Sequence, residues 1–446
     1  MTLKISISGI RGIVGESLTE EIASGIAKAF GTYIKKGKIA VAGDTRKSTG
    51  SLKDAVLSAL AEAGCTPVDL GICPTPTVGI VINKLKLSGG IMITASHNPA
   101  EWNGLKLFSK NGTFLREKEL TEVVEIWKSK KFKKEKRANI KKEKKALNIH
   151  IKKILGAIDV LSIRKRHFKV AIDPCNGAGG KIAELLLKEL GCKISAINTE
   201  EKKPFPRPPE PTPENINELA DLTKKKRADI GFALDPDADR LAIVSEKGEA
   251  LSEEYTLAIA ADYILSKAKK KIIVINLSTS MIIDDIAKKQ SAKVIRTKIG
   301  EANVLRGMLK SGAPIGGEGN GGVIYPKISL TRDGLTAIAL ILEYLAKSKK
   351  QISEIVGDLP KYYMRKEKIR ITSGKNIKGA LKKLQEKYKL ENLDLKDGVK
   401  VVFKDSSLHV RPSNTEPIIR IVTESRSMDK TLSLSKTTLA FLSQAF

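Results

Sequence analysis

The stretch Lys38–Gly64, KIAVAGDTRKSTGSLKDAVLSALAEAG, decides the fold of this chain. It opens with an apolar, β-prone run, continues with a loop of small and polar residues, and ends with the pattern of an amphipathic helix. The β-prone segment Thr66–Gly71 follows directly. This order predicts a β-α-β unit, in which two parallel strands lie in one sheet and the helix packs against its face.

The same pattern occurs twice more along the chain. It returns as KVAIDPCNGAGGKIAELLLKELG from Lys169 and as KIIVINLSTSMIIDDIAKKQSA from Lys271, and the β-prone Ala292–Arg296 follows the latter. The repeats begin roughly 100 to 130 residues apart, a spacing typical of separate domains and too long for the units of a solenoid. We therefore expect three related α/β domains.

The chain beyond about residue 366 follows a different pattern. A helical stretch, Asn376–Tyr388, precedes two alternating strands, Val399–Phe403 and Ile418–Thr423, and a closing helix. The predicted fold class is α/β, with three related α/β domains with mixed sheets and a smaller C-terminal α+β domain. The expected domains are residues 1–155, 160–255, 256–362 and 366–446.

Linkers are expected near residues 150–167, around Glu253 and over Asp358–Lys366. The proline-rich segment Pro204–Pro213 is too short to be a linker, and we expect an extended loop inside the second domain.

The composition indicates a soluble, cytoplasmic protein that does not enter a membrane. Apolar residues make up 41% of the 446 residues, and we find no signal peptide. We also find no uninterrupted apolar run of about 18 residues, the length needed to cross a bilayer. The four cysteines are too few for a disulfide scaffold and form no CxxC pair, so they are expected to be reduced thiols that bind no zinc.

The net charge of +29 fits a nucleic-acid-binding protein, an enzyme with an anionic substrate, or a lysine-rich proteome. Much of this charge lies in Lys128–Lys145, where few aromatic residues are available to stack on bases. We interpret this segment as a solvated helical face, and we do not expect nucleic acid to be the main partner.

A serine lies where α/β folds collect ligands. The loop TASHNPAEWNGLK, Thr94–Lys106, follows an apolar strand that includes Gly90, so it lies at the end of that strand. Ser96 is there exposed to an incoming substrate. We interpret His97 as a loop-shaping or phosphate-contacting residue and not as the base of Ser96, because the side chains of consecutive residues usually point apart. Taken alone, the pattern is better explained as an Asn-Pro turn.

Three carboxylates follow the predicted strand Asp229–Leu234. Asp235, Asp237 and Asp239 alternate in DPDADR, a segment too polar and too proline-constrained for a helix, and can turn one face toward a hard cation. Without a metal, three adjacent anions would repel one another. An EF-hand is excluded because Arg240 stands where that loop requires glycine. A phosphatase with Asp235 as its nucleophile is the second choice among enzymes.

Two further loops could bind a sugar phosphate. In GGEGNGGV, Gly316–Val323, the glycines allow close approach of the backbone, while Glu318 and Asn320 could bind vicinal hydroxyls. In RPSNTEP, Arg411–Pro417, an arginine and several polar side chains could form an anion cradle. A glycine turn and a polar hairpin loop explain each segment separately, but they do not explain why all four loops occur in one chain.

The motifs TASHNP, DPDADR, GEGNGG and RPSNTEP, in this order and at this spacing, resemble those of the α-D-phosphohexomutases over the whole chain. The resemblance implies four domains around a central cleft. It also implies that the chain interconverts hexose 6-phosphate and hexose 1-phosphate through a phosphoserine and a 1,6-bisphosphate intermediate. The implied partner is a small-molecule sugar phosphate, and the expected oligomeric state is a monomer or a homodimer.

The resemblance assigns roles to individual residues. It implies one Mg²⁺ per chain, with a sugar 1,6-bisphosphate as activator, and the implied metal ligands are the phosphoserine Ser96, Asp235, Asp237 and Asp239. Arg11 and Lys106 would assist proton transfer, and Arg240 would lie near the transferring group. The implied substrate-binding residues are Glu318 and Asn320 for the hydroxyls, and Arg411, Ser413, Asn414 and Thr415 for the phosphate that is not transferred.

The sugar loop departs from one common family form, Glu-x-Ser-Gly-His, because Asn320 and Gly322 replace the serine and the histidine. The form found here is similar to that of archaeal-type and some bacterial phosphoglucosamine or phosphomannose/phosphoglucose mutases. We expect glucosamine phosphate as the substrate, with a phosphomannomutase/phosphoglucomutase as the alternative. A DxD phosphatase and a basic nucleic-acid-binding protein are more distant alternatives.

Overall fold

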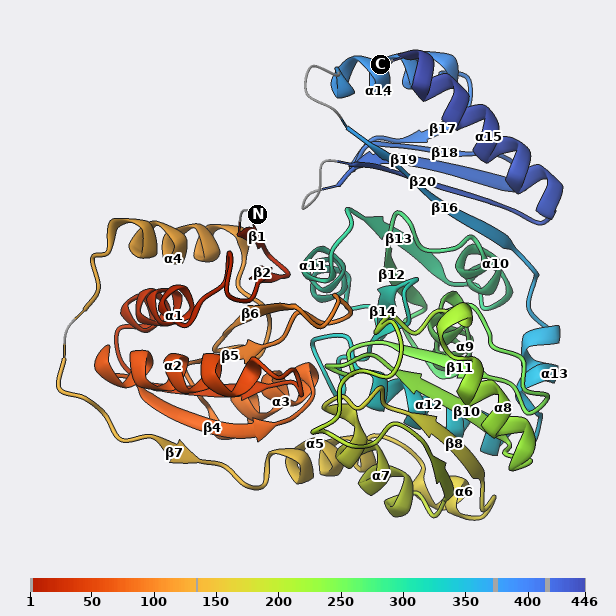
Figure 1. The fold of residues 1–446 in the computed structure, drawn as a ribbon. Helices are drawn as coiled ribbons and strands as arrows, with labels where there is room; N and C mark the ends of the chain where they lie inside the picture. The colour runs from red at the N-terminus through yellow and green to blue at the C-terminus, as the bar shows by residue number, and fades with distance from the viewer. Residues whose placement is uncertain (1–2, 134, 372–375, 414–417, 446) are drawn as a thin grey trace. The chain divides into compact units, whose positions relative to one another are not determined.

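The computed structural model describes residues 3–133, 135–371, 376–413 and 418–445 (Figure 1). The chain divides into two compact units. The first unit comprises Met1–Tyr263 and Asn320–Val356, and the second comprises Ile264–Gly319 and Gly357–Phe446. The first unit therefore contains the serine and aspartate loops, and the second contains Glu318 and Arg411.

The first unit begins with a mixed seven-stranded sheet. β3 (Lys38–Gly43) pairs in parallel with both β4 (Thr66–Ile72) and β5 (Gly89–Ile93), as the first β-α-β pattern predicts. The strand order is β1-β2-β6-β5-β3-β4-β7, and the other strands are β1 (Lys4–Ser6), β2 (Gly9–Ile13), β6 (Trp102–Ser109) and β7 (Lys141–Lys142).

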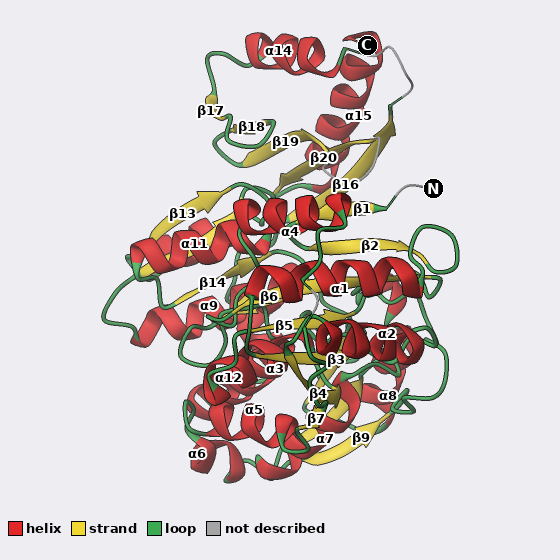
Figure 2. Ribbon diagram, turned by 90° about the vertical axis from the view of Figure 1, so that its left-hand side faces the viewer, coloured by secondary structure: helices red, strands yellow, loops and turns green. Residues whose placement is uncertain are grey.

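Helices cover both faces of this sheet (Figure 2). Val41 faces one core and its neighbour Ala40 faces the other, because successive side chains of a strand point to opposite faces. The first core is completed by α1 (Glu20–Ile34), α2 (Thr49–Glu62) and α4 (Glu117–Ser129). The second is completed by α3 (Thr75–Leu85) and α5 (Ala146–Leu155). Burial on both sides explains why these strands are apolar without alternation.

A second mixed sheet lies in the same unit. β8 (Lys169–Asp173) runs parallel to β9 (Lys193–Ala196) and β10 (Ile230–Leu234), and β11 (Leu241–Val244) is antiparallel to β10. This arrangement confirms the second β-α-β pattern. The other elements of the unit are α6 (Val160–Arg164), α7 (Gly179–Glu189), the 3₁₀ helix η1 (Pro213–Asn215), α8 (Asn217–Lys225), β15 (Gly322–Ile324), α12 (Gly334–Ser348) and α13 (Ile352–Gly357), whose last residue falls in the second unit.

The second unit starts within α9 (Glu254–Lys267) and contains the third β-α-β pattern. Its strand β12 (Ile272–Asn276) is parallel to both β13 (Lys293–Thr297) and β14 (Ile315–Glu318). The helices of this region are α10 (Ile282–Lys289) and α11 (Glu301–Ser311).

The C-terminal part of the second unit is built on an antiparallel sheet with the order β16-β20-β19-β18-β17. Its strands are β16 (Tyr363–Arg370), β17 (Asn392–Asp394), β18 (Val399–Val402), β19 (Ser406–Pro412) and β20 (Ile418–Ser425). Its helices are α14 (Ile377–Lys387) and α15 (Met428–Ala445), and both pack on the sheet through an apolar core that includes Leu384 and Leu442.

The predicted fold class is confirmed: three α/β/α regions with mixed sheets are followed by a C-terminal region with an antiparallel sheet. The four domain boundaries stay a prediction. Among the described residues, no helix combines the length and the apolar character that crossing a bilayer requires. The proline-rich segment 204–212 is a loop without regular structure, as expected, and η1 begins at Pro213.

One expectation about the lysine-rich regions is wrong. The run Lys128–Lys145 is not a helical face, because α4 ends at Ser129 and the described residues 130–140 contain no helix. Lysines three or four positions apart would repel one another on a helix, which disfavours that conformation. The linker expected at 150–167 contains the end of α5 and the whole of α6, and its role as a linker stays a prediction.

Candidate active site

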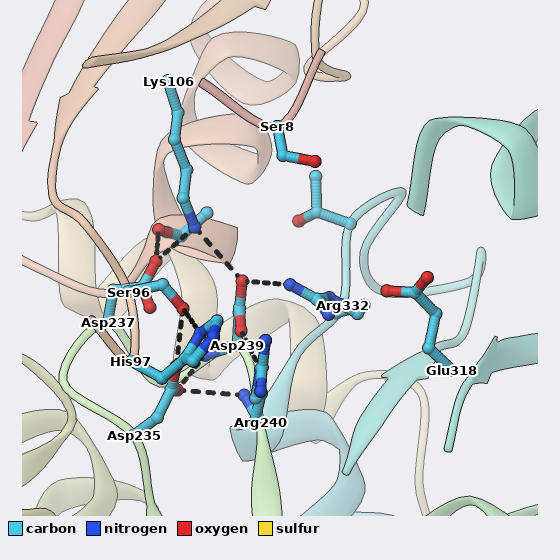
Figure 3. Close-up of polar contacts among 12 residues, drawn as sticks. Ser8, Ser96, His97, Lys106, Asp235, Asp237, Asp239, Arg240, Glu318 and Arg332 are labelled. Atoms are coloured by element: carbon cyan, nitrogen blue, oxygen red, sulfur yellow. Dashed lines mark hydrogen bonds and ion pairs between the residues drawn. The ribbon is translucent and has the colours of Figure 1, made fainter. Parts of the chain in front are cut away.

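Ser96 lies just beyond the apolar strand β5, as predicted. The expectation that it is exposed is wrong, because only 1% of its surface is exposed and its hydroxyl is directed at Asp235. Its backbone is left-handed, with a φ of 52°, which is uncommon for a residue other than glycine. Thr94 holds this turn, because its Oγ1 accepts a hydrogen bond from Ser96 N at 2.9 Å. Ser96 Oγ donates to Asp235 Oδ2 at 2.9 Å, so the serine loop and the aspartate loop meet (Figure 3).

A buried arginine that the sequence analysis did not single out holds the serine loop in place. The guanidinium of Arg46 donates to the backbone carbonyls of Ser96 at 2.5 Å, Asn98 at 2.8 Å and Pro99 at 2.6 Å. Its charge is balanced by Asp44, whose Oδ2 lies 3.1 Å from Arg46 Nε. Both side chains of this ion pair are fully buried, so the pair fixes the serine loop to the end of the neighbouring strand β3.

We expect Arg46→Met to lower the free energy of unfolding by about 3–5 kcal/mol, because the substitution leaves the buried Asp44 carboxylate without its partner. Urea unfolding of the purified variant measures the change. The matched control is Arg116→Met, since Arg116 forms an exposed ion pair with Glu119 and should show no measurable change. Equal stability of the two variants would contradict the role assigned to Arg46.

The three aspartates of the second motif form one buried cluster. Asp235, Asp237 and Asp239 follow the buried strand β10, and each is fully shielded from solvent. Asp235 Oδ1 closes the turn by accepting hydrogen bonds from the backbone N–H of Asp239 at 3.0 Å and of Arg240 at 3.1 Å. One carboxylate oxygen from each aspartate lies within 4.8 Å of the other two.

Cationic side chains surround this cluster (Figure 3). Lys106 Nζ lies 2.6 Å from Asp237 Oδ2 and 3.2 Å from Asp239 Oδ2. Arg332, a buried residue that the sequence analysis missed, donates to Asp239 Oδ2 at 2.7 Å. Thr75, at the start of α3, also donates through its hydroxyl to Asp237 Oδ2.

The charges around the cluster shift the pKa values of its members. Burial and repulsion by the other two aspartates raise the pKa of Asp235 well above its ordinary value. Burial alone would also raise the pKa of Asp239, but the neighbouring cations, first Arg332 and then Lys106, hold it below its ordinary value. Although burial opposes it, the carboxylates of Asp237 and Asp239 raise the pKa of Lys106.

The residues of the cluster fit a hard divalent cation. Oδ1 of Asp237 and Oδ1 of Asp239 are buried and accept no hydrogen bond. A buried acceptor without a donor is costly, and hard cations prefer carboxylate oxygens. The cluster is therefore consistent with a metal site, with the serine hydroxyl beside it.

His97 lies closer to Ser96 than the sequence analysis expected. Its Nδ1 is 3.4 Å from Ser96 Oγ. The expectation that these consecutive side chains point apart is wrong, because the left-handed turn at Ser96 departs from the extended backbone on which it rests. Burial, followed by the nearby charges of Arg240 and Arg11, lowers the pKa of His97 well below its ordinary value, so the imidazole is neutral.

Arg11 and Arg240 also contribute to this site. Arg11, on β2, donates to Asn98 Oδ1 in the serine loop at 2.8 Å, and its Nε is buried without a hydrogen-bond partner. Burial lowers the pKa of Arg11 to about 10. Arg240 forms an ion pair with Glu210 at 2.5 Å, and its Nε lies 3.8 Å from Asp239 Oδ1.

The predicted sugar-binding residues fall in both units. In the second unit, Glu318 ends β14 and is buried, and its Oε1 accepts hydrogen bonds from Asn276 Nδ2 at 2.8 Å and from Gly300 N at 3.1 Å. In the first unit, the Oδ1 of Asn320 is buried without a hydrogen-bond partner.

The predicted phosphate-binding residues are only partly described. Arg411 lies on β19 in the second unit, is mostly buried, and has its Nε 3.2 Å from Asp397 Oδ1. Ser413 N donates to Ile418 O at 2.8 Å. The other two predicted residues, Asn414 and Thr415, lie outside the described residues.

Comparison with known proteins places four segments of the chain in one family. The phosphoglucomutase/phosphomannomutase family matches through its alpha/beta/alpha domain I over residues 3–134, domain II over 148–248, domain III over 252–363 and its C-terminal domain over 366–438.

Individual relatives match over almost the full length of the chain. A phosphoglucomutase/phosphomannomutase of Thermococcus kodakarensis is 41% identical, with 95% of this chain and 94% of that protein covered. A probable phosphoglucosamine mutase of Methanopyrus kandleri is 33% identical, with the same coverage of 95% and 94%. A crystal structure of a phosphoglucomutase/phosphomannomutase family protein from Burkholderia thailandensis matches with a TM-score of 0.86, at 25% identity, and covers 99% of this chain and 98% of that one.

Proposed function

The chain belongs to the phosphoglucomutase/phosphomannomutase family, and from this membership we propose that it moves a phosphoryl group between the 1- and 6-hydroxyls of a hexose through Ser96. It is a phosphohexomutase, an isomerase that acts on sugar phosphates. The observation that carries the proposed role of Ser96 is its hydrogen bond to Asp235, which sets the hydroxyl beside the three-aspartate cluster.

In the proposed reaction, Ser96 Oγ carries the phosphoryl group in the resting enzyme. The bond between phosphorus and Oγ breaks as the free hydroxyl of the sugar phosphate bonds to phosphorus, which gives a 1,6-bisphosphate. The bisphosphate then turns, and its other phosphoryl group returns to Ser96 Oγ. The left-handed turn and the three hydrogen bonds from Arg46 support this role, because they fix the position of the Ser96 backbone before substrate arrives.

The attacking hydroxyl must lose its proton, and we propose that Arg11 and Lys106 assist this transfer. Arg11 donates to Asn98 Oδ1 in the serine loop at 2.8 Å, and Lys106 Nζ lies 2.6 Å from Asp237 Oδ2 and 3.2 Å from Asp239 Oδ2. Both side chains therefore contact the loops proposed to hold the phosphoryl group, and a residue that assists proton transfer must be within reach of the proton.

We propose Mg²⁺ as the cation of the cluster, with Asp235, Asp237, Asp239 and Ser96 as its ligands, where it would neutralise charge on the transferring phosphoryl group. Arg240, anchored by Glu210, would lie beside that group. His97 is neutral and adds no charge to the site, in accord with a role in shaping the loop or contacting the phosphate.

The remaining predicted residues would hold the substrate away from the reaction centre. Glu318 and Asn320 are proposed to bind the sugar hydroxyls. The phosphate that is not transferred would be bound by Arg411, Ser413, Asn414 and Thr415. Such remote contacts let binding energy position the reacting hydroxyl.

For the sugar itself, we propose glucose and mannose phosphates. The relative named phosphoglucomutase/phosphomannomutase shares 41% of its residues with this chain, and the relative named probable phosphoglucosamine mutase shares 33%. Glucosamine phosphate, the substrate expected from the sequence, is the second candidate, and the relative named probable phosphoglucosamine mutase supports it. The form of the sugar loop with Asn320 and Gly322 is similar to that of mutases of both kinds and does not separate the two candidates.

The test is conversion of glucose 1-phosphate, mannose 1-phosphate and glucosamine 6-phosphate by the purified protein, with Mg²⁺ and a trace of the matching 1,6-bisphosphate. We expect isomerisation, fastest with glucose or mannose phosphate, and a phosphate adduct on Ser96 in the intact mass. Fastest turnover of glucosamine 6-phosphate would select the second candidate. Release of inorganic phosphate without isomerisation would instead identify a phosphatase.

A further inference from the structure

Asp397, in the turn between β17 and β18, contacts two parts of the second unit at once. Its Oδ1 accepts from Arg411 Nε at 3.2 Å, and its Oδ2 accepts from the backbone N of Ile299 at 2.9 Å. The side chain of Asp397 is 14% exposed and that of Arg411 is 8% exposed, so solvent screens their ion pair little.

The second contact of Asp397 leads directly to Glu318. Ile299 N donates to Asp397, and the next backbone N–H, that of Gly300, donates to Glu318 Oε1 at 3.1 Å. Asn276 Nδ2 donates to the same oxygen at 2.8 Å. The carboxylates of Asp397 and Glu318 are therefore bound by the backbone N–H groups of two consecutive residues.

The turn that carries Asp397 is shaped to lie against Arg411. Gly398 has a φ of +77°, and a Cβ at this position would lie 2.2 Å from Val410 O and 2.8 Å from Arg411 Cα. Only glycine fits there. The backbone O of Asp397 also accepts from His409 Nε2 at 2.7 Å. Because a carbonyl only accepts, Nε2 carries the proton, and His409 Nδ1 accepts from Ser278 Oγ at 2.9 Å.

We propose that Asp397 is a positioning residue that sets the guanidinium of Arg411 relative to the carboxylate of Glu318. The inference rests on the proposed function, in which Glu318 binds sugar hydroxyls and Arg411 binds the phosphate that is not transferred. A substrate held at both ends binds best when its two anchors are fixed before it arrives, since less freedom is then lost on binding. Asp397 contacts Arg411 through Nε, and the two terminal nitrogens of a guanidinium are the pair that can bind an anion side by side.

The test is a double-mutant cycle of Asp397→Asn and Arg411→Ala, read as kcat/KM for the best sugar phosphate. Asparagine keeps the shape of Asp397 but has one acceptor oxygen and no charge, so it loses one of the two contacts. We expect Asp397→Asn alone to lower kcat/KM about 10- to 100-fold, mostly through KM. In the Arg411→Ala background the same substitution should change kcat/KM by less than about threefold, because Asp397 acts through Arg411.

Two controls separate this role from a purely structural one. Asp394→Asn, in the neighbouring strand, loses only a contact to Lys396 and should leave kcat/KM unchanged. Thermal unfolding of each variant shows whether the fold is retained. If Asp397→Asn lowers kcat/KM equally in the unmodified protein and in the Arg411→Ala variant, the positioning role of Asp397 is wrong, while the proposed function stands. No effect of Arg411→Ala would overturn the proposed role of Arg411 as well.

Discussion

Ser96→Ala is expected to lower mutase activity about 10⁴-fold or more while the protein stays folded. Alanine has no oxygen to carry the phosphoryl group, and loss of a nucleophile that forms a covalent intermediate has effects of this size. The substitution removes one hydrogen bond, from Ser96 Oγ to Asp235, but keeps the backbone contacts with Arg46 and Thr94. Isomerisation rate, intact mass and thermal unfolding are the three measurements.

The matched control for this prediction is Ser51→Ala. Ser51 lies on α2 with its side chain exposed, so the variant should keep both the phosphate adduct and full turnover. Activity of Ser96→Ala within tenfold of the unmodified protein would exclude a phosphoserine mechanism at this position. A phosphate adduct that persists in Ser96→Ala would place the carrier on another residue.

Removal of divalent metal is expected to lower activity about 1000-fold or more, because several kcal/mol of charge stabilisation at the phosphoryl group would be lost. Binding should also be visible without catalysis. At a Mg²⁺ concentration about 100 times the Kd, the folded protein should gain about 2.7 kcal/mol of stability. Chelation with EDTA, followed by assay and thermal unfolding with and without added Mg²⁺, measures both effects.

Asp237→Asn tests whether this stabilisation comes from the aspartate cluster. Asp237 Oδ1 is buried without a hydrogen bond, and replacing the carboxylate with an amide weakens a hard-cation site. We expect the stabilisation by Mg²⁺ to disappear in this variant. It should be retained in Asp69→Asn, where the lost contact is an ion pair with Lys53. Equal stabilisation by Mg²⁺ in the two variants would place the metal elsewhere.

The sequence predicted that Ser96 and Asp235 lie at the ends of buried strands, because the strands before them have a strong pattern. Ser96 follows β5 and Asp235 follows β10, and both strands are completely buried and parallel to a neighbour. In parallel sheets the carboxyl ends of such strands collect ligands. The contact between Ser96 and Asp235, however, joins loops 139 positions apart that follow strands of two different sheets. Only the family resemblance implies that these residues lie together, and no local pattern predicts it.

The residues that support the site were missed for different reasons. Arg46 follows β3, a neighbour of β5, so its position at a strand end was a signal that could have been used. Arg332 reaches Asp239 from 93 positions away and precedes a helix, so only the tertiary fold shows its role. Thr75 is the first residue of α3, and a single threonine after a proline gives no sign that it contacts an aspartate 162 positions away.

The first unit is assembled from residues 1–263 and 320–356, and the ribosome makes residues 264–319 of the second unit between them. Arg332, which contacts the aspartate cluster, and α12 both belong to the later stretch. Asp333 caps α12, and its Oδ2 lies 2.9 Å from Nε2 of the buried His150, which is translated 183 positions earlier. A nascent chain that ends before residue 320 therefore contains the serine loop and the aspartate loop, but it lacks the contacts that Arg332 and α12 make in the first unit. The surroundings of the aspartate cluster are therefore complete only after Arg332 and α12 have been translated.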